Sequence, residues 1–132
     1  MKLELQATPE EVMRAVEELR AFGRSHGLDD QALFGLALAL EECATNIVRH
    51  ACGGRPQEKF SVGFERAAGM LAVELRDRGP AFDPNSAPAR PAEDDVAGGW
   101  GIGLARRNVD EIRYLRDGGE NVLRLVKRIQ SG

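Results

Sequence analysis

Residues 60–77 have the sequence FSVGFERAAGMLAVELRD, in which apolar residues alternate with polar or small ones. This alternation predicts two strands, and the short stretch 67–69 predicts the turn between them. The apolar residues on one side are Phe60, Val62 and Phe64 in the first strand and Leu71, Val73 and Leu75 in the second. Strands joined by so short a turn pair antiparallel, so we expect the helices to cover one face of the sheet.

The segments flanking this hairpin predict further helices and strands. Thr8 suits a helix N-cap and Pro9 the first helical position, and Glu11 lies three residues after the cap, as in a capping box. The expected elements are a strand at 2–7, a helix from Pro9, a helix at about 31–50, a helix that opens after the glycines at 98–103 and includes 109–112, and a last strand at 121–128. The fold class is therefore α+β, a two-layer α/β sandwich whose mixed, mostly antiparallel sheet is covered on one face by three helices, in a single domain spanning 1–132.

The composition is typical of a globular protein that binds neither nucleic acid nor a membrane. The 132 residues are 42% apolar and 30% charged, and the formal net charge is −3, which argues against the basic face that nucleic-acid binding needs. No apolar run is long enough to span a bilayer, and the N-terminus lacks the apolar core of a secretory signal. We therefore expect a cytoplasmic protein in which Cys43 and Cys52 are reduced thiols.

The first candidate motif is Glu42-Cys43-Ala44-Thr45-Asn46. Glu42 and Asn46 are four residues apart and project from the same face of the expected helix, behind the small residues Ala39 and Gly35. These small residues leave room for a ligand, and the oxygens of a carboxylate and a carboxamide suit Mg²⁺. The alternative is a polar helix end that meets solvent.

The second motif begins at Asp77, which follows the strand that ends the hairpin. The alternation places its carboxylate on the face of Leu71, Val73 and Leu75, where burial is costly unless a donor pairs with it. The amino group of adenine is one such donor. The alternative is a turn aspartate that caps the backbone of its own loop, the usual behaviour of an Asp-x-Gly segment.

The third motif is Gly98-Gly99-Trp100-Gly101-Ile102-Gly103-Leu104, which follows an aperiodic stretch over 78–97 that is rich in proline and alanine. Closely spaced glycines let a backbone approach a ligand, and the following helix start attracts phosphate. The segment matches neither a Walker loop nor a dinucleotide-binding fingerprint. The alternative is a flexible linker.

In this order and spacing, the three motifs resemble the N, G1 and G2 boxes of the GHKL ATP-binding superfamily. That superfamily includes the ATPase domains of gyrases, heat-shock chaperones, histidine kinases and mismatch-repair proteins, and its fold is the Bergerat ATP-binding fold. The stand-alone form, with Arg49-His50-Ala51 after Asn46, is most similar to the anti-sigma factor serine/threonine kinases of the RsbW and SpoIIAB type. Segments 109–112 and 122–128 also resemble that family, so the similarity covers essentially the whole chain.

The resemblance implies a role for each motif. Glu42 would be the general base that accepts a proton from the attacking hydroxyl, Asn46 would coordinate Mg²⁺ at the ATP phosphates, and Asp77 would accept a hydrogen bond from adenine. Residues 83–97 would form the ATP lid. The further nucleotide contacts implied are Gly79, Phe82, Gly99, Gly101, Ile102, Gly103 and Leu104.

The function implied is that of an ATP-dependent protein serine/threonine kinase. Its partners would be an anti-anti-sigma-type protein, which it phosphorylates, and a sigma factor, which it sequesters. The alternative is an ATP-binding regulatory module that binds a protein partner without phosphorylating it, and Glu42 argues against this because such a module needs no base. Relatives are commonly dimers, so we also expect a homodimer formed through the first strand and helix.

Overall fold

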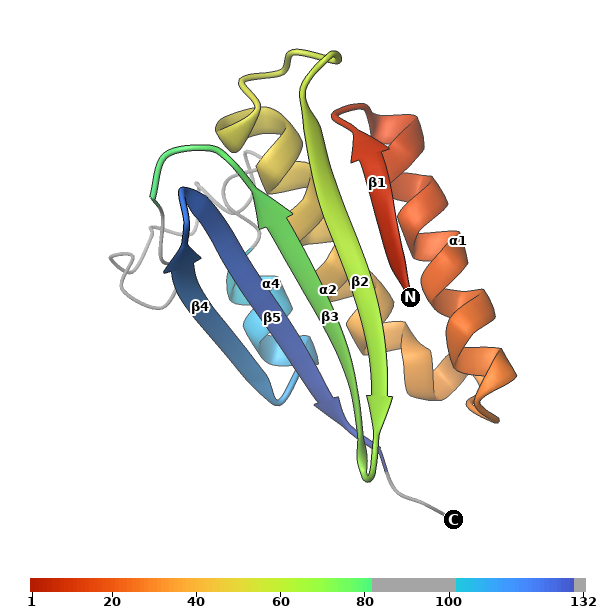
Figure 1. Cartoon of the computed structure of the whole chain (residues 1–132). Helices are drawn as coiled ribbons and strands as arrows, with labels where there is room; N and C mark the ends of the chain where they lie inside the picture. Colours follow the sequence, from red (N-terminus) through yellow and green to blue (C-terminus); the bar gives the residue numbers. More distant parts are fainter. Residues whose placement is uncertain (82–101, 130–132) are drawn as a thin grey trace.

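The computed structural model describes residues 1–81 and 102–129, and Figure 1 shows how their helices and strands are arranged. The elements in chain order are β1 (Lys2–Gln6), α1 (Pro9–Ser25), α2 (Asp30–Asn46), η1 (Ile47–Ala51), β2 (Lys59–Ala67), β3 (Met70–Asp77), α4 (Ile102–Asn108), β4 (Glu111–Asp117) and β5 (Glu120–Arg128). Element η1 is one π-helical segment that continues α2. The helix expected at about 31–50 is therefore α-helical only as far as Asn46.

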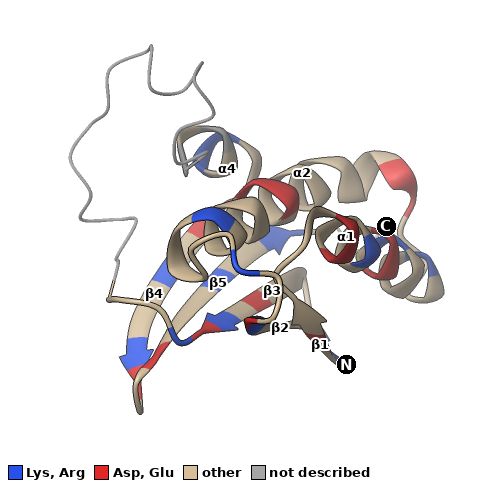
Figure 2. Ribbon diagram, turned by 90° about the horizontal axis from the view of Figure 1, so that it is seen from above, with Lys and Arg blue, Asp and Glu red and all other residues tan. Residues whose placement is uncertain are grey.

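Within the described residues, five strands form one sheet in the order β1-β2-β3-β5-β4, and every neighbouring pair is antiparallel. The hairpin at 60–77 is the β2–β3 pair, in which Val62 lies opposite Leu75 and Phe64 opposite Val73. The helices form one layer over one face of the sheet (Figure 2). The predicted two-layer α+β fold is confirmed.

Both long helices begin at side-chain caps. The hydroxyl of Thr8 accepts a hydrogen bond from the backbone N–H of Glu11 at 3.2 Å, and the Glu11 carboxylate accepts the backbone N–H of Gln6 at 3.3 Å. Asp29 caps α2 by accepting the backbone N–H of Ala32 at 2.8 Å. Such caps contribute about 1 kcal/mol each. They also fix where each helix begins, and thus which residues of α2 face away from the core.

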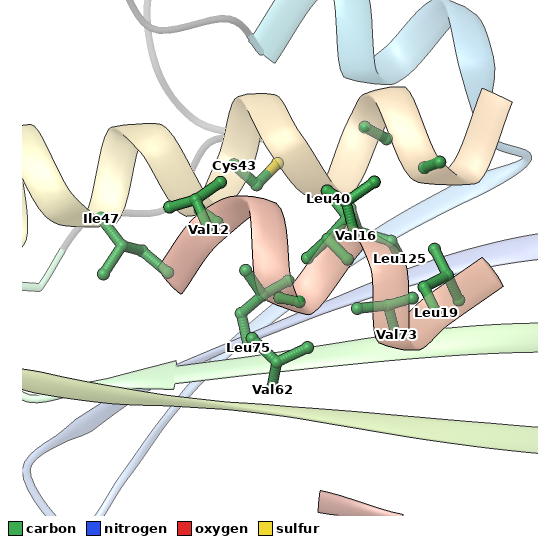
Figure 3. Close-up of a cluster of buried hydrophobic side chains, with 14 of the residues drawn as sticks. Val12, Val16, Leu19, Leu40, Cys43, Ile47, Val62, Val73, Leu75 and Leu125 are labelled. Carbon is green, nitrogen blue, oxygen red and sulfur yellow. The ribbon is translucent and has the colours of Figure 1, made fainter. Parts of the chain in front are cut away.

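The core lies between the helix layer and the sheet (Figure 3). Its central side chains are at most 3% exposed and come from α1, α2 and three strands: Val12, Val16, Leu19, Leu40, Cys43, Val62, Val73, Leu75 and Leu125. The side chains of α1 and α2 point toward those of the strands (Figure 3). This apolar contact holds α2 against the sheet along one stripe.

The expectation of helix over 109–112 was wrong. Helix α4 ends at Asn108, and β4 begins at Glu111. The backbone N–H of Asp110 donates to the carbonyl of Val126 at 2.9 Å, and the Asp110 carboxylate accepts the backbone N–H of Arg128 at 2.6 Å. These bonds align the chain with β5, so Ile112, one of the apolar residues that suggested a helix face, lies in a strand instead.

The other face of the sheet carries ion pairs. Arg76 follows Leu75 along β3 and therefore lies on the face opposite the core. Its guanidinium lies 3.2 Å from the carboxylate of Glu74, 3.4 Å from that of Glu120 and 3.5 Å from that of Asp117. A charged network of this kind suits a sheet face in contact with water.

None of the helices in residues 1–81 and 102–129 has the length and apolar character needed to cross a membrane.

Helix α4 packs on α2 at Gly35. A Cβ atom at this position would lie 2.7 Å from the backbone carbonyl oxygen of Asn108. The interpretation of Gly35 as part of a small-residue floor for a ligand was therefore wrong, because α4 takes that space. The glycine is needed for the approach of one helix backbone to another.

We expect Gly35→Ala to destabilise the fold by about 1–3 kcal/mol, because the added methyl group meets backbone atoms that cannot rotate away. This loss would outweigh the gain of about 1 kcal/mol that alanine normally brings to a helix. Urea unfolding followed by circular dichroism measures the difference. The control is Gln31→Ala, an exposed position one turn earlier on the same helix. A more stable Gly35→Ala variant would contradict the close contact between α2 and α4.

Candidate functional site

Glu42 and Asn46 lie at the C-terminal end of α2 and project from the same face. Both side chains are partly buried, whereas Cys43 and Ala44 between them are buried in the core. The helix keeps α-helical geometry through Asn46 and becomes π-helical at Ile47. The carboxylate and the carboxamide are therefore held by a helix that is anchored along its apolar side.

The surroundings of Glu42 raise the pKa of its carboxyl above the ordinary value of 4.5. The largest cause is partial burial, which disfavours the charged form, and the second is the negative charge of Glu41. The positive charge of Arg49 acts in the opposite direction. A carboxylate with a raised pKa is a stronger proton acceptor once it is ionised. Glu42 is thus a candidate proton acceptor.

The amide nitrogen of Asn46 is buried and has no hydrogen-bond partner among the described residues. Leaving a buried polar group unpaired costs about 1–3 kcal/mol, so this amide is ready to pair with a ligand or a water molecule. The amide and carboxylate oxygens of Asn46 and Glu42 are also the hard ligands that Mg²⁺ prefers. No group of three or more His, Cys, Asp or Glu that could hold a metal occurs within the described ranges. The donor set therefore fits a Mg²⁺ shared with the phosphates of a ligand rather than one enclosed by protein groups alone.

Asp77 is 6% exposed at the end of β3, on the face of the core. Its Oδ1 accepts the backbone N–H of Gly79 at 2.8 Å and the side-chain N–H of Asn121 at 2.9 Å. The first bond is the local turn considered as the alternative from the sequence, and it coexists with burial. Among residues 1–81 and 102–129, no hydrogen-bond donor contacts Oδ2 of Asp77. This oxygen is an acceptor available to a ligand.

Gly79 lies against the end of η1. A Cβ atom at Gly79 would lie 2.6 Å from the Cβ and 2.8 Å from the Cα of Ala51, so the loop after β3 can approach η1 only through a glycine. Ala51 follows Asn46 by five residues, and Gly79 follows Asp77 by two. The contact therefore connects the two motifs, and in Figure 1 the end of β3 lies at the same end of the molecule as η1.

The third motif is described only in part. Helix α4 begins at Ile102, and its exposed Gly103 accepts a hydrogen bond from Nε of Arg107 at 3.2 Å through its backbone carbonyl. The side chains of Ile102 and Leu104 are not described. The other nucleotide contacts expected from the resemblance lie outside the described residues: Phe82, Gly99, Gly101 and the lid at 83–97.

The structure adds Asn121, a site residue that the sequence did not single out. It is 6% exposed and lies directly opposite Asp77 in the β3–β5 pair. The sequence pattern could have indicated it, because Asn121 alternates with Leu123 and Leu125 along the strand and is therefore a polar residue at a core-facing position. Its importance depends on pairing with a strand more than forty residues away, which local patterns do not reveal.

Neither cysteine is part of this arrangement. Cys43 and Cys52 are buried free thiols. Burial raises the pKa of Cys43 to about 12, and burial together with the charges of Asp77 and Glu58 raises that of Cys52. Both are therefore protonated and unreactive while the protein is folded.

Comparison with known proteins identifies the family. A family model described as the histidine kinase-like ATPase domain matches residues 5–127, which include α2, the hairpin at 60–77, β4 and all but the last residue of β5. The chain belongs to this family of ATP-binding domains. Among curated proteins, it is similar to the serine-protein kinase RsbW of Listeria innocua, with 28% identity over 129 aligned residues that cover 92% of this chain and 82% of the relative.

Solved structures show the same fold. The chain superposes on a structure of the SiaB–SiaC complex from Pseudomonas aeruginosa with a TM-score of 0.71 and 16% identity, covering 96% of this chain and 88% of the other. It also superposes on the RsbU and RsbW domains of a Mycobacterium tuberculosis protein, with a TM-score of 0.69 and 21% identity. That match covers 97% of this chain but 32% of the longer protein.

We expect Glu42→Gln to raise the melting temperature at pH 7 and to change it little at pH 4. The folded-state pKa of Glu42 lies above its unfolded-state value, so the wild-type protein loses stability as the pH rises from the lower value through the higher one. Glutamine does not ionise and avoids this loss. Scanning calorimetry at both pH values measures the difference, and Glu17→Gln, at an exposed position on α1, is the control. An equal gain at both pH values would show that the effect is not caused by ionisation of Glu42.

Proposed function

We propose that the protein is an ATP-dependent protein serine/threonine kinase of the anti-sigma factor type. It phosphorylates an anti-anti-sigma-type protein and sequesters a sigma factor. The observation that carries the proposal is the pair on α2, a carboxylate with a raised pKa four residues before an amide with an unpaired buried nitrogen. Similarity to a serine-protein kinase along most of the chain supports the choice of a hydroxyl as the phosphate acceptor.

In this proposal Glu42 accepts the proton of the attacking serine hydroxyl. A base on a rigid helix can be positioned accurately, which matters because phosphoryl transfer depends mainly on alignment and charge neutralisation. Asn46 and the phosphates of ATP would hold Mg²⁺, and the ion would supply neutralisation of the phosphate charge. The raised pKa of Glu42 strengthens it as a proton acceptor, and its charge is partly balanced by Arg49.

Asp77 would bind the adenine base. Its Oδ2 is an acceptor without a partner among the described residues, which matches the exocyclic amino group of adenine. The expected roles of Gly79, Phe82 and the glycine segment at 98–103 in nucleotide binding, and of residues 83–97 as the lid, are part of the same proposal. Residues 1–132 would form one catalytic domain.

The partner of the kinase would be a small folded protein that presents a serine. A solved relative of the same fold is a complex between SiaB and SiaC, which supports the idea that this fold binds a partner protein. A homodimer through β1 and α1 is also proposed, since β1 is an edge strand and Met13 on α1 is 44% exposed.

We expect Glu42→Gln to lower phosphoryl transfer by about 10²–10⁴-fold, the usual contribution of a general base, without weakening ATP binding. Transfer from γ-labelled ATP to an anti-anti-sigma-type protein is followed by mass spectrometry of its serine residues, and ATP affinity is measured by calorimetry. Asp77→Asn is the matched variant, because it can place an amide donor where adenine needs an acceptor. In contrast to Glu42→Gln, it is expected to weaken ATP binding.

Two outcomes would change this proposal. Transfer at the wild-type rate by Glu42→Gln would overturn the assignment of the base. ATP binding by the wild-type protein, together with partner binding but no phosphorylated serine, would identify the regulatory module instead of a kinase.

A further inference from the structure

Asp77, Asn121 and Arg116 form a polar row across three neighbouring strands. Asn121 on β5 lies opposite Asp77 on β3 on one side and opposite Arg116 on β4 on the other. We call these three residues the polar row. It occupies the end of the sheet next to Gly79 and Pro80, and its central member is buried.

The amide nitrogen of Asn121 donates toward β3 and the loop that follows it. It donates to Oδ1 of Asp77 at 2.9 Å and to the carbonyl oxygen of Pro80 at 2.8 Å, and it lies 3.4 Å from the carbonyl oxygen of Gly79. One side chain thus joins the buried carboxylate to the loop that follows it.

The amide oxygen of Asn121 faces two donors. It accepts a hydrogen bond from Nη1 of Arg116 at 3.1 Å and another from the hydroxyl of Tyr114. Nη1 of Arg116 also donates to the carbonyl oxygen of Gly79 at 2.8 Å. Turning the amide by 180° would place its N–H groups against the guanidinium and its oxygen against the carboxylate of Asp77. The neighbouring groups therefore determine the orientation of the amide.

The two carboxylate oxygens of Asp77 therefore have different roles. Oδ1 accepts hydrogen bonds from Gly79 and Asn121, and Oδ2, which has no donor within 1–81 and 102–129, is left for a ligand. We propose that Asn121 is a positioning residue for base recognition: it fixes the Asp77 carboxylate so that Oδ2 accepts a hydrogen bond from the 6-amino group of a purine. The inference rests on the proposed binding of adenine by Asp77. It adds Asn121 as the residue on which selectivity for the 6-amino group depends.

Loss of the Asn121 amide would leave Oδ1 with the local bond from Gly79 alone. The carboxylate could then rotate or bind water, and the distinction between a purine with and without the amino group would weaken. A residue that only stabilised the fold would, on removal, weaken the binding of both nucleotides equally. The ratio of the two affinities is therefore the informative quantity.

The test compares ATP with purine riboside triphosphate, which lacks the 6-amino group, by titration calorimetry. We expect the wild-type protein to bind ATP at least about tenfold more tightly, the value of one hydrogen bond to a charged group. In Asn121→Ala this ratio is expected to fall to within about twofold. Tyr114→Phe, which removes one hydroxyl and keeps the ring, is expected to lower the ratio partway and remains informative if Asn121→Ala fails to fold.

Arg113→Ala is the matched control, since Arg113 is exposed on the same strand, as Arg116 is, but its guanidinium pairs with Glu111 at 2.8 Å and not with Asn121. It is expected to keep the wild-type ratio. If the wild-type protein binds ATP but shows no preference for the amino group, the assignment of Asp77 to adenine fails and the inference fails with it. If the wild-type preference is present and persists in Asn121→Ala, or in Tyr114→Phe where Asn121→Ala does not fold, the role of Asn121 alone is overturned.

Discussion

The burial of the Asp77 carboxylate at the end of β3 is the constraint on which this site depends. A carboxylate that is 6% exposed needs donors, and the chain supplies one from its own loop and one from the neighbouring strand. The second donor, Asn121, is present only if β5 pairs with β3 in the observed register. The position of one acidic group is thus set by the pairing of strands that are far apart in the sequence.

The helix layer makes a different contribution. The cap at Asp29 and the apolar stripe of α2 fix the rotation of that helix, and this rotation keeps Glu42 and Asn46 only partly buried. Both groups are held at a cost, because the ionised carboxylate is partly desolvated and the buried amide nitrogen is unpaired. Local violations of otherwise satisfied packing are expected where a ligand binds. The burial of Leu40 and the other core residues offsets the cost of the desolvated carboxylate and the unpaired amide.

Much of the fold could be predicted because its signals are local. The hairpin at 60–77 follows from alternation and a glycine turn, and the start of α1 follows from Thr8 and Pro9. Strand β4 could not be recognised in this way, since its first residues fit a helical spacing and become a strand only by bonding to β5. The same limit applies to the site. Glu42 and Asn46 are close in sequence, whereas the bond from Arg116 to the Gly79 carbonyl joins residues 37 positions apart.

The contact between Gly35 and Asn108 has a mechanical consequence. Helix α4 has seven residues, too few to be stable alone, so its position is set by the helix on which it packs. That helix also carries Glu42 and Asn46, so a tilt of α2 would move these two side chains and α4 together as one unit. Asp77 and Asn121 belong to the sheet and would not move with α2. A tilt of α2 relative to the sheet would therefore be felt where Ala51 meets Gly79, the close contact between the segment that follows Glu42 and Asn46 and the loop that follows Asp77.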